Sequence, residues 1–305
     1  MAGTDKTVLL TGATGLLGRA VVRKFEATEG WKIVGTGYSR GGAGIVKIDL
    51  NDTAAVEKLV AEVKPSIVIH AAAERRPDVA AKNPELTKKL NVFATEQLAR
   101  ITAAQDVPLI YISTDYVFDG SKPPYQPEDK ANPTNLYGET KYDGETVVRA
   151  ENPRGHVLRV PVLYGKAEYN AESAVNILMD VVLNEAKKPK VDMDNWSVRY
   201  PTNVDDVARV LRDLSETILA GAAVPPVLHF SSEQKYTKYE ICLLYAELMA
   251  VPTDHLVRVD ELEATPGVIR PHDCHLSSDR LAALGIDVSN VDFKAWWQRA
   301  ALPLL

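Results

Sequence analysis

A glycine-rich segment close to the N-terminus constrains the fold more than any other feature. Residues 11–18 read TGATGLLG, follow a short apolar run and precede a helical pattern. This strand–turn–helix context is typical of a turn that binds a dinucleotide. Gly12 permits the sharp turn, Gly15 lets backbone approach a pyrophosphate, and Gly18 lets the helix pack tightly on the strand. The helix N-terminus favours the phosphate charge. We expect a bound dinucleotide, with a ligand-free turn as the alternative.

Apolar, β-branched runs alternate with helical patterns through the first half of the chain. Continuous apolar strands separated by helices indicate a parallel sheet that is covered on both faces. The pattern therefore predicts an α/β, Rossmann-type, doubly wound sheet. We expect strands at residues 7–10, 32–35, 45–48, 66–69, 108–113 and 156–160, and helices at residues 15–26, 53–63, 84–105 and 137–150.

The second half of the chain is less regular. Residues 122–135 contain four prolines, which predicts an ordered loop. Beyond residue 165 we expect a strand at residues 227–230 and helices at residues 173–184, 204–219, 238–249 and 293–302. No clean linker separates the halves. We therefore expect a dinucleotide-binding domain at residues 1–165, and a smaller C-terminal α/β substrate lobe at residues 166–305 that interleaves with it.

Composition excludes several classes of function. The net charge of −6 argues against a general nucleic-acid binder, which usually carries a basic excess. No apolar stretch approaches the roughly 20 residues of a membrane-spanning helix, and the polar N-terminus resembles no secretory signal. The two cysteines, Cys242 and Cys274, have no paired spacing and suit a reducing compartment. We expect a cytoplasmic protein that contacts neither nucleic acid nor membrane.

Histidines offer no metal site in this sequence. The run Arg270–His275 (RPHDCH) holds potential ligands, but its spacing matches no zinc pattern and no second cluster completes four ligands. We expect no bound metal. His70 ends a predicted strand, and we interpret it as a core histidine whose hydrogen bonds are satisfied.

The end of the second predicted strand distinguishes between coenzymes. An NAD site usually places an acid there for the ribose 2′-hydroxyl, whereas residues 37–40 read GYSR. Ser39 and Arg40 can bind a 2′-phosphate, which favours NADP(H) over NAD(H). A solvated loop position for Arg40 is the alternative. Asp49, after the third strand, can reach the adenine amino group. Small side chains after the fourth strand let the dinucleotide lie against backbone at Ala71, Ala72 and Ala73.

Three side chains form a candidate catalytic set. Tyr137 and Lys141 are four residues apart at the start of a predicted helix, so their side chains share one face. An ammonium beside a phenol lowers the pKa of the phenol towards working pH. Thr114 ends the fifth predicted strand, where open α/β sheets form their ligand crevice. Its hydroxyl can hold a substrate carbonyl while Tyr137 gives or takes a proton and hydride passes to or from a nicotinamide.

Together these residues resemble the extended short-chain dehydrogenase/reductase family. Residues 111–120 (YISTDYVFDG), residues 135–138 (NLYG) with Lys141, and Arg270-Pro271 are similar to dTDP-4-dehydrorhamnose reductases. A closer resemblance, to the regulatory beta subunit of methionine adenosyltransferase, rests on residues 72–79 (AAERRPDV), residues 159–165 (RVPVLYG) and residues 199–202 (RYPT). The resemblance covers nearly the whole chain.

The resemblance implies a set of binding residues. Glu74, Arg75 and Asp115 would lie at the substrate cleft, and Lys141 would bond the nicotinamide ribose. Trp196 and Arg199 can contact a substrate or serve packing of the smaller lobe. Contacts to the coenzyme would come from Gly12, Thr14, Gly15, Leu16, Leu17, Arg40, Ala72, Tyr137, Lys141 and Val160.

Two functions are compatible with these features. The first is an NADPH-dependent reductase of a nucleotide-linked keto-sugar or a similar small molecule. The second is a regulatory protein that binds methionine adenosyltransferase and uses NADP(H) as a structural ligand. The alternative protein partner is a second copy of this chain, in a homodimer. The charged Glu74-Arg75-Arg76, where sugar reductases have a small polar segment, argues against a deoxysugar nucleotide. The chain stops at Leu305 without the longer tail of animal regulatory subunits, which argues against the second function.

Overall fold

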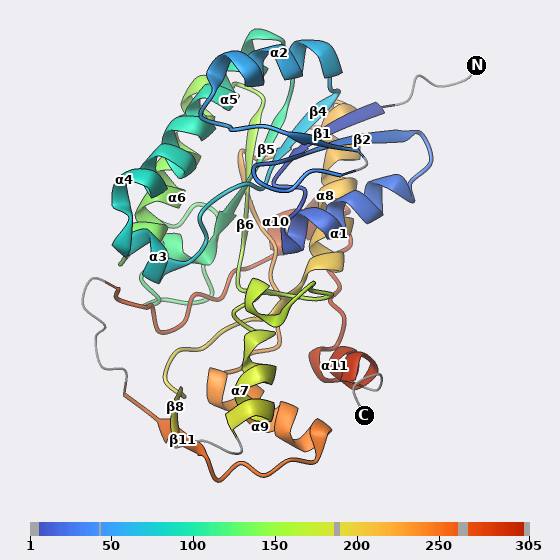
Figure 1. The fold of residues 1–305 in the computed structure, drawn as a ribbon. Helices are drawn as coiled ribbons and strands as arrows, with labels where there is room; N and C mark the ends of the chain where they lie inside the picture. The colour runs from blue at the N-terminus through green and yellow to red at the C-terminus, as the bar shows by residue number, and fades with distance from the viewer. Residues whose placement is uncertain (1–5, 43, 186–189, 262–267, 302–305) are drawn as a thin grey trace.

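A parallel seven-stranded sheet forms the centre of the larger lobe (Figure 1). The structure is a computed structural model that describes residues 6–42, 44–185, 190–261 and 268–301. The strand order is β10-β6-β5-β4-β1-β2-β3, so the direction of winding reverses between β1 and β4. The strands are β1 (Lys6–Thr11), β2 (Trp31–Gly37), β3 (Ile45–Lys47), β4 (Ile67–His70), β5 (Leu109–Thr114), β6 (Gly155–Val160) and β10 (Val227–His229).

Helices cover both faces of this sheet, as the sequence predicts. One layer consists of α2 (Thr53–Val63), α5 (Ala94–Ala104) and α6 (Leu136–Glu151). The opposite layer consists of α1 (Leu16–Glu26), α8 (Val204–Leu219) and the short α10 (Asp279–Ala283). The predicted doubly wound α/β fold is therefore confirmed.

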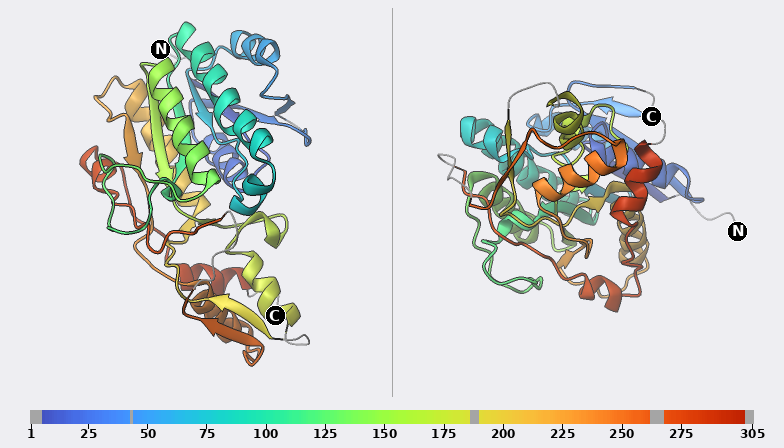
Figure 2. Two further views of the ribbon diagram at one scale, coloured as in Figure 1. Left: turned by 90° about the vertical axis from the view of Figure 1, so that its left-hand side faces the viewer. Right: turned by 90° about the horizontal axis from the view of Figure 1, so that it is seen from below.

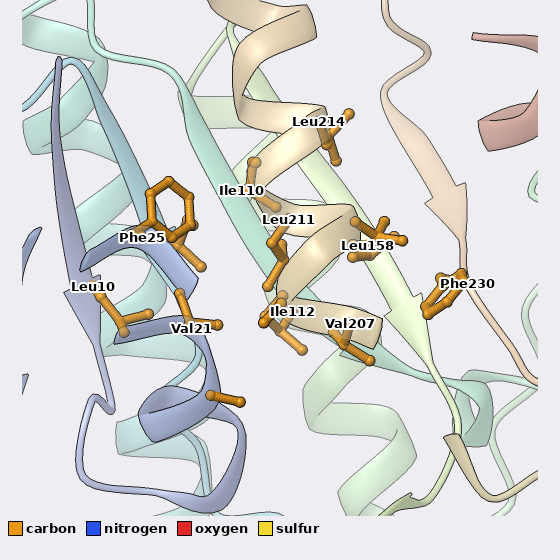
Figure 3. Packing of buried hydrophobic residues seen from close by; sticks show 14 of the residues in the cluster. Leu10, Val21, Phe25, Ile110, Ile112, Leu158, Val207, Leu211, Leu214 and Phe230 are labelled. Atoms are coloured by element: carbon orange, nitrogen blue, oxygen red, sulfur yellow. The ribbon is translucent and has the colours of Figure 1, made fainter. Parts of the chain in front are cut away.

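The core beneath α1 and α8 explains why these segments are helical. Their apolar residues repeat at helical spacing and belong to one hydrophobic cluster, which includes Val21 and Phe25 from α1 and Leu211 and Leu214 from α8 (Figure 3). Each such side chain contributes about 1.5–3 kcal/mol when it is removed from water. Burial of this shared face fixes α1, and hence the glycine turn that precedes it, against β1.

The smaller lobe lies at the carboxyl end of the sheet (Figure 2). An aromatic core that includes Tyr164, Tyr245, Phe293 and Trp297 joins its helices. These helices are α7 (Ile177–Glu185), α9 (Lys238–Met249) and α11 (Phe293–Ala301). Two parallel strand pairs complete the lobe: β8 (Val191–Asp194) with β11 (Leu256–Val259), and β7 (Leu163–Tyr164) with β9 (Thr202–Asn203).

The chain returns to the larger lobe after it has entered the smaller one. β10 pairs with β6, and α8 packs against α1, although both segments come from the second half of the sequence. The two halves thus interleave in space. The boundary between residues 165 and 166 stays a prediction.

Several elements differ from their predicted extents. The single helix predicted for residues 84–105 consists of α4 (Pro84–Lys88), a π-helical turn η1 (Lys89–Phe93) and α5, and α3 (Pro77–Lys82) precedes it. The helix predicted at residues 173–184 begins at Ile177, after a 3₁₀ turn η3 (Asn170–Glu172). Residue 302, predicted to end the last helix, lies outside the described residues. The short strands of the smaller lobe, and α10, were not predicted because two to five residues carry too little periodicity.

The proline-rich loop at residues 122–135 is ordered and leads directly into α6, as predicted. A 3₁₀ turn η2 (Asp115–Val117) precedes it. Within the described ranges, no helix combines the length and apolar character that crossing a bilayer requires.

Candidate active site

The glycine turn joins β1 to α1 at the point where the sheet reverses direction. Gly12 has a φ of +73°, and a Cβ there would lie 2.9 Å from the backbone nitrogen of Ala72 at the end of β4. A Cβ at Gly18 would overlap the carbonyl oxygen of Gly12. Gly18 therefore lets α1 lie close to the residues that directly follow β1.

The N-terminus of α1 is suited to an anion. Gly15 is its N-cap, and no side chain caps the helix. Backbone amides of the first turn therefore keep their hydrogen-bonding capacity for a ligand. A Cβ at Gly15 would lie 3.4 Å from the oxygen of Gly12. Apart from the residues next to Gly15 in the chain, no other described atom lies within 4 Å of that position. Turn, helix and small residues together fit the pyrophosphate of a dinucleotide.

Arg40 lies against the glycine turn. Its Nη2 donates a hydrogen bond to the carbonyl oxygen of Thr14 at 2.8 Å, and its Nη1 forms an ion pair with Glu168 at 2.5 Å. The side chain is nevertheless 45% exposed, which leaves part of the guanidinium accessible. Ser39 beside it is exposed as well. Both groups predicted to bind a 2′-phosphate thus lie at the surface next to the turn.

Asp49 follows β3 and is exposed. Its Oδ1 accepts hydrogen bonds from the backbone and side-chain nitrogens of Asn51, both at 2.9 Å. The carboxylate therefore caps a local turn.

The segment after β4 is held from two sides. Its Ala71, Ala72 and Ala73 are half-buried, and the backbone nitrogen of Ala72 donates to Thr11 Oγ1 at 3.3 Å. On the other side, Asn91 of η1 accepts from the backbone nitrogen of Glu74 at 2.9 Å and donates to its oxygen at 3.0 Å.

Asn91 is a site residue that the sequence pattern did not reveal. It is fully buried, and its side chain also donates to Thr140 Oγ1 of α6 at 3.1 Å. The amide thus joins η1, α6 and the segment that lines the glycine turn. No local signal marks it, because several of its neighbours along the chain are polar as well, among them Lys88, Lys89 and Thr95.

His70 is a core histidine, as interpreted from the sequence. It hydrogen-bonds Thr11 Oγ1 through Nδ1 at 2.6 Å and Thr95 Oγ1 through Nε2 at 2.9 Å. Burial, and next the charge of Lys141, lower the pKa of His70 to about 3. The ring is neutral at physiological pH and supports the ends of β1 and β4.

Thr114 and Tyr137 meet where β5 ends and α6 begins. Tyr137 is the second residue of α6, and Thr114 is the last residue of β5. The Thr114 side chain lies close enough to the Tyr137 phenol to act on its pKa. Val160, at the end of β6, pairs with Thr114 and is buried. The structure therefore brings together the residues that end β5 and β6 with the start of α6, close to the glycine turn.

Lys141 lies one helical turn further along α6 and is buried. Its Nζ donates to the carbonyl oxygen of Ile112 at 2.7 Å and lies 4.0 Å from the ring centroid of Tyr111. Burial lowers the pKa of Lys141 to about 7, against the opposing charge of Glu145. The side chain is thus directed to β5.

Tyr137 does not have the predicted lowered pKa. Burial raises the pKa of its phenol above the usual value, although hydrogen bonding with Thr114 opposes this effect. The expectation that Lys141 lowers this pKa towards working pH is therefore wrong for this structure. Two causes account for the difference: removal from water disfavours the phenolate, and the negative charge of Asp115 disfavours it further.

Asp115 is a buried carboxyl beside Thr114. Thr114 Oγ1 donates to its Oδ1 at 3.0 Å. Burial raises the pKa of Asp115 to about 7, while hydrogen bonds and the more distant charge of Arg199 oppose the rise. Its negative charge in turn raises the pKa of Tyr137. The electrostatic environment of the phenol therefore changes with pH around neutrality.

Arg75 and Glu74, which were also predicted to lie at the substrate cleft, differ in their relation to Tyr137. The positive charge of Arg75 acts on the phenol of Tyr137 and favours its ionised form. Glu74 instead accepts two hydrogen bonds from the Arg76 side chain, at 3.0 and 3.1 Å.

Trp196 and Arg199 have partners within the smaller lobe. Trp196 packs on the ring of His272 with centroids 4.7 Å apart, and Arg199 binds Asp194 at 2.7 Å. His275 stacks on Tyr200 at 4.1 Å. Among the described residues, no group of three or more His, Cys, Asp or Glu side chains is arranged to hold a metal ion.

Comparisons with known proteins place this site in context. A sequence model of the family described as RmlD substrate binding domain matches residues 6–300. The methionine adenosyltransferase 2 subunit beta of Bos taurus is 42% identical over 282 residues, which cover 92% of this chain and 83% of the relative. A probable low-salt glycan biosynthesis reductase of Haloferax volcanii is 31% identical over 232 residues, or 75% of each chain.

Solved structures share the fold over nearly the whole chain. A dTDP-4-dehydrorhamnose reductase from Clostridium acetobutylicum superposes with a TM-score of 0.83 and 24% identity, covering 98% of this chain and 100% of the other. The dTDP-4-dehydrorhamnose reductase from Bacillus anthracis, solved in complex with NADP, has a TM-score of 0.80 and 22% identity, covering 99% and 100%.

Proposed function

The chain belongs to the RmlD substrate binding domain family, and we propose on that premise that it is an NADP(H)-binding reductase. Its substrate would be the carbonyl of a nucleotide-linked keto-sugar or a similar small molecule. The observation that carries the proposal is the proximity of Thr114, at the end of β5, to Tyr137, at the start of α6, beside the glycine turn. The resemblance to dTDP-4-dehydrorhamnose reductases and to methionine adenosyltransferase beta subunits, predicted from the sequence, is confirmed.

In this proposal the coenzyme lies across the reversal point between β1 and β4. Backbone amides at the start of α1 would hold the pyrophosphate, because the missing side chain at Gly15 leaves room for it, while Gly12 and Gly18 permit the turn and its close contact with α1. Ser39 and Arg40 would bind the 2′-phosphate. Asp49 would reach the adenine, the backbone at Ala71, Ala72 and Ala73 would support the dinucleotide, and Thr14, Leu16, Leu17, Lys141 and Val160 would complete the contacts.

The chemistry would centre on Tyr137. The bound coenzyme supplies the hydride. Because burial raises its pKa, the Tyr137 phenol is protonated at neutral pH and can donate its proton to the substrate oxygen. Thr114 would hold the same oxygen through its hydroxyl. Asp115 and Arg75 would set the charge around the phenol, and Lys141 would hold the nicotinamide ribose.

Turnover assays test the reductase directly. Purified protein, NADPH and a panel of nucleotide-linked keto-sugars should give consumption of NADPH and a reduced sugar. Tyr137→Phe should lower kcat by about 100-fold or more, since a positioned proton donor contributes about 10²–10⁴-fold. Equal rates for wild type and Tyr137→Phe, or no turnover with any substrate of the panel, would exclude this function.

A second candidate is a regulatory subunit of methionine adenosyltransferase that uses NADP(H) as a structural ligand. The observation that favours it is the 42% identity over 92% of the chain to proteins with that name. Titration of the catalytic subunit from the same organism should then yield a stable complex with altered kinetics. Chromatography that finds the two proteins separate, with unchanged kinetics, would exclude it. Self-association into a homodimer would be visible in the same chromatogram.

A cytoplasmic location is part of both candidates. Cys242 and Cys274 are free and buried, which suits a reducing compartment.

A further inference from the structure

An acidic segment from the second half of the chain reaches the glycine turn. Residues 166–173, called the acidic segment below, follow β7 and include Glu168 and Glu172. Glu172 accepts hydrogen bonds from both terminal nitrogens of Arg19 in α1, at 2.9 and 2.5 Å. Glu168 forms its ion pair with Arg40, across 128 positions of sequence. Two carboxylates therefore lie among the cations that flank the turn.

The two arginines share one acceptor on the turn. Arg19 Nη1 donates to the carbonyl oxygen of Thr14 at 2.7 Å, and Arg40 Nη2 donates to the same oxygen at 2.8 Å. Arg40 is thus fixed on one side by the turn and on the other by Glu168. Glu172 also lies 3.8 Å from Arg40, but its two hydrogen bonds go to Arg19.

The acidic segment is anchored without the Glu168 side chain. The backbone nitrogen of Glu168 donates to Glu172 Oε2 at 2.9 Å, and Glu172 is 5% exposed. Ser173 Oγ donates to the oxygen of Leu163 at 2.7 Å. In contrast, the Glu168 side chain is 51% exposed, so its ion pair adds little to stability. Its carboxylate can therefore act on a ligand without being needed for the fold.

We propose that Glu168 is a specificity-determining residue that weakens binding of a 2′-phosphate at Arg40. The inference rests on the proposed function, in which Arg40 receives that phosphate. The carboxylate of Glu168 occupies Nη1 of the same guanidinium, and its negative charge repels the dianionic phosphate. NAD(H) lacks this phosphate, so Glu168 opposes only NADP(H). Glu168 thereby reduces the preference of the site for NADP(H) over NAD(H).

The expected size of this effect is modest. Two anions on one guanidinium, at a hydrated surface, repel each other enough to change affinity roughly fivefold at low salt. Salt screens exposed charges, so the effect shrinks as ionic strength rises.

Calorimetric titration of Glu168→Gln tests the proposal. The amide keeps the shape of the side chain and removes the charge. Compared with wild type at low salt, the variant should bind NADPH about fivefold more tightly and NADH with unchanged affinity. At high salt, Glu168→Gln and wild type should bind NADPH with nearly equal affinity. Unchanged or weaker NADPH binding, or an equal gain for both coenzymes, would overturn the proposal.

Two further variants serve as controls. Glu57→Gln removes an exposed carboxylate from α2, away from the turn, and should leave the affinity for NADPH unchanged. In an Arg40→Ala background, Glu168→Gln should improve NADPH binding less than it does in wild type, because only the direct repulsion of the phosphate is then relieved. A gain as large as in wild type would contradict the role of the shared guanidinium. Wild-type protein that binds neither coenzyme would instead overturn the proposed function, and this inference with it.

Discussion

At the scale of single residues, close backbone contact decides what the glycine turn tolerates. Gly18 lies in α1, where alanine is normally favoured over glycine by about 1 kcal/mol. The carbonyl oxygen of Gly12 occupies the space that a Cβ would need. We therefore predict that Gly18→Ala lowers the free energy of unfolding by about 1–3 kcal/mol, as measured in urea, and weakens NADPH binding.

Gly42→Ala is the matched control for this prediction. A Cβ at Gly42 would meet no described atom within 4 Å, so its stability and affinity should stay near those of wild type. If the Gly18→Ala protein were as stable as wild type, the turn would be able to shift and accommodate the added Cβ, which would contradict the prediction.

Asp115 gives a pH-dependent contribution with a defined sign. Its pKa is raised to about 7 in the folded protein, above the usual value of 3.8. The folded state therefore binds more protons between these values, and the contribution of Asp115 to stability falls as pH rises through this window. The free energy of unfolding of wild type minus that of Asp115→Asn should fall by up to about 3 kcal/mol between pH 5 and 7.

Denaturation in urea at several pH values measures this difference. The subtraction removes the opposing contributions of the buried His70 and His229, whose pKa values are lowered to about 3. A difference that is flat from pH 5 to 7 would show that Asp115 ionises normally.

The sequence predicted the backbone conformation of single residues well where that conformation is set locally. Gly12, Gly15 and Gly18 follow from one short segment with a clear context. Asn91, Glu168 and Glu172 were missed because each acts on a distant part of the chain; Glu172 meets Arg19 across 153 positions. The raised pKa of Tyr137 was missed for a related reason, since burial depends on the whole fold.

At the scale of elements, the π-helical turn η1 has a specific consequence. It places the Asn91 side chain against the backbone of Glu74, where it satisfies both a donor and an acceptor. Asn91→Ala should leave these groups unpaired, lower the free energy of unfolding by about 1–3 kcal/mol and speed hydrogen exchange at Glu74.

Leu86→Ala provides the control on the neighbouring α4. Leu86 is 68% exposed, so its truncation should change stability little. Unchanged exchange at Glu74 in Asn91→Ala would mean that other contacts hold the segment after β4.

Long elements with strong periodicity were predicted correctly, and short ones were not. α1, α2 and α8 lie where their apolar spacing placed them. The interruption at η1 was missed, because a single π-helical turn is too short to be recognised from the spacing of apolar residues in one sequence. The two-residue strands β7 and β9 exist through tertiary contact rather than through local preference.

At the scale of the whole molecule, the interleaved chain connects the coenzyme site to the smaller lobe. The acidic segment leads from the glycine turn into α7, and Asn170 donates to Asp180 of that helix at 2.6 Å. The doubly wound fold could be predicted because continuous apolar strands require cover on both faces. The return of β10 to the sheet could not, since pairing with β6 depends on a partner about 70 residues away.

The central claim is that the glycine turn and Arg40 bind NADP(H). Calorimetric titration of nucleotide-free protein with NADPH and with NADH tests it most directly. A charge-assisted contact to the 2′-phosphate should make NADPH bind at least about tenfold more tightly than NADH. Binding of neither coenzyme at millimolar concentration would contradict the account, and tighter binding of NADH would refute the role of Arg40.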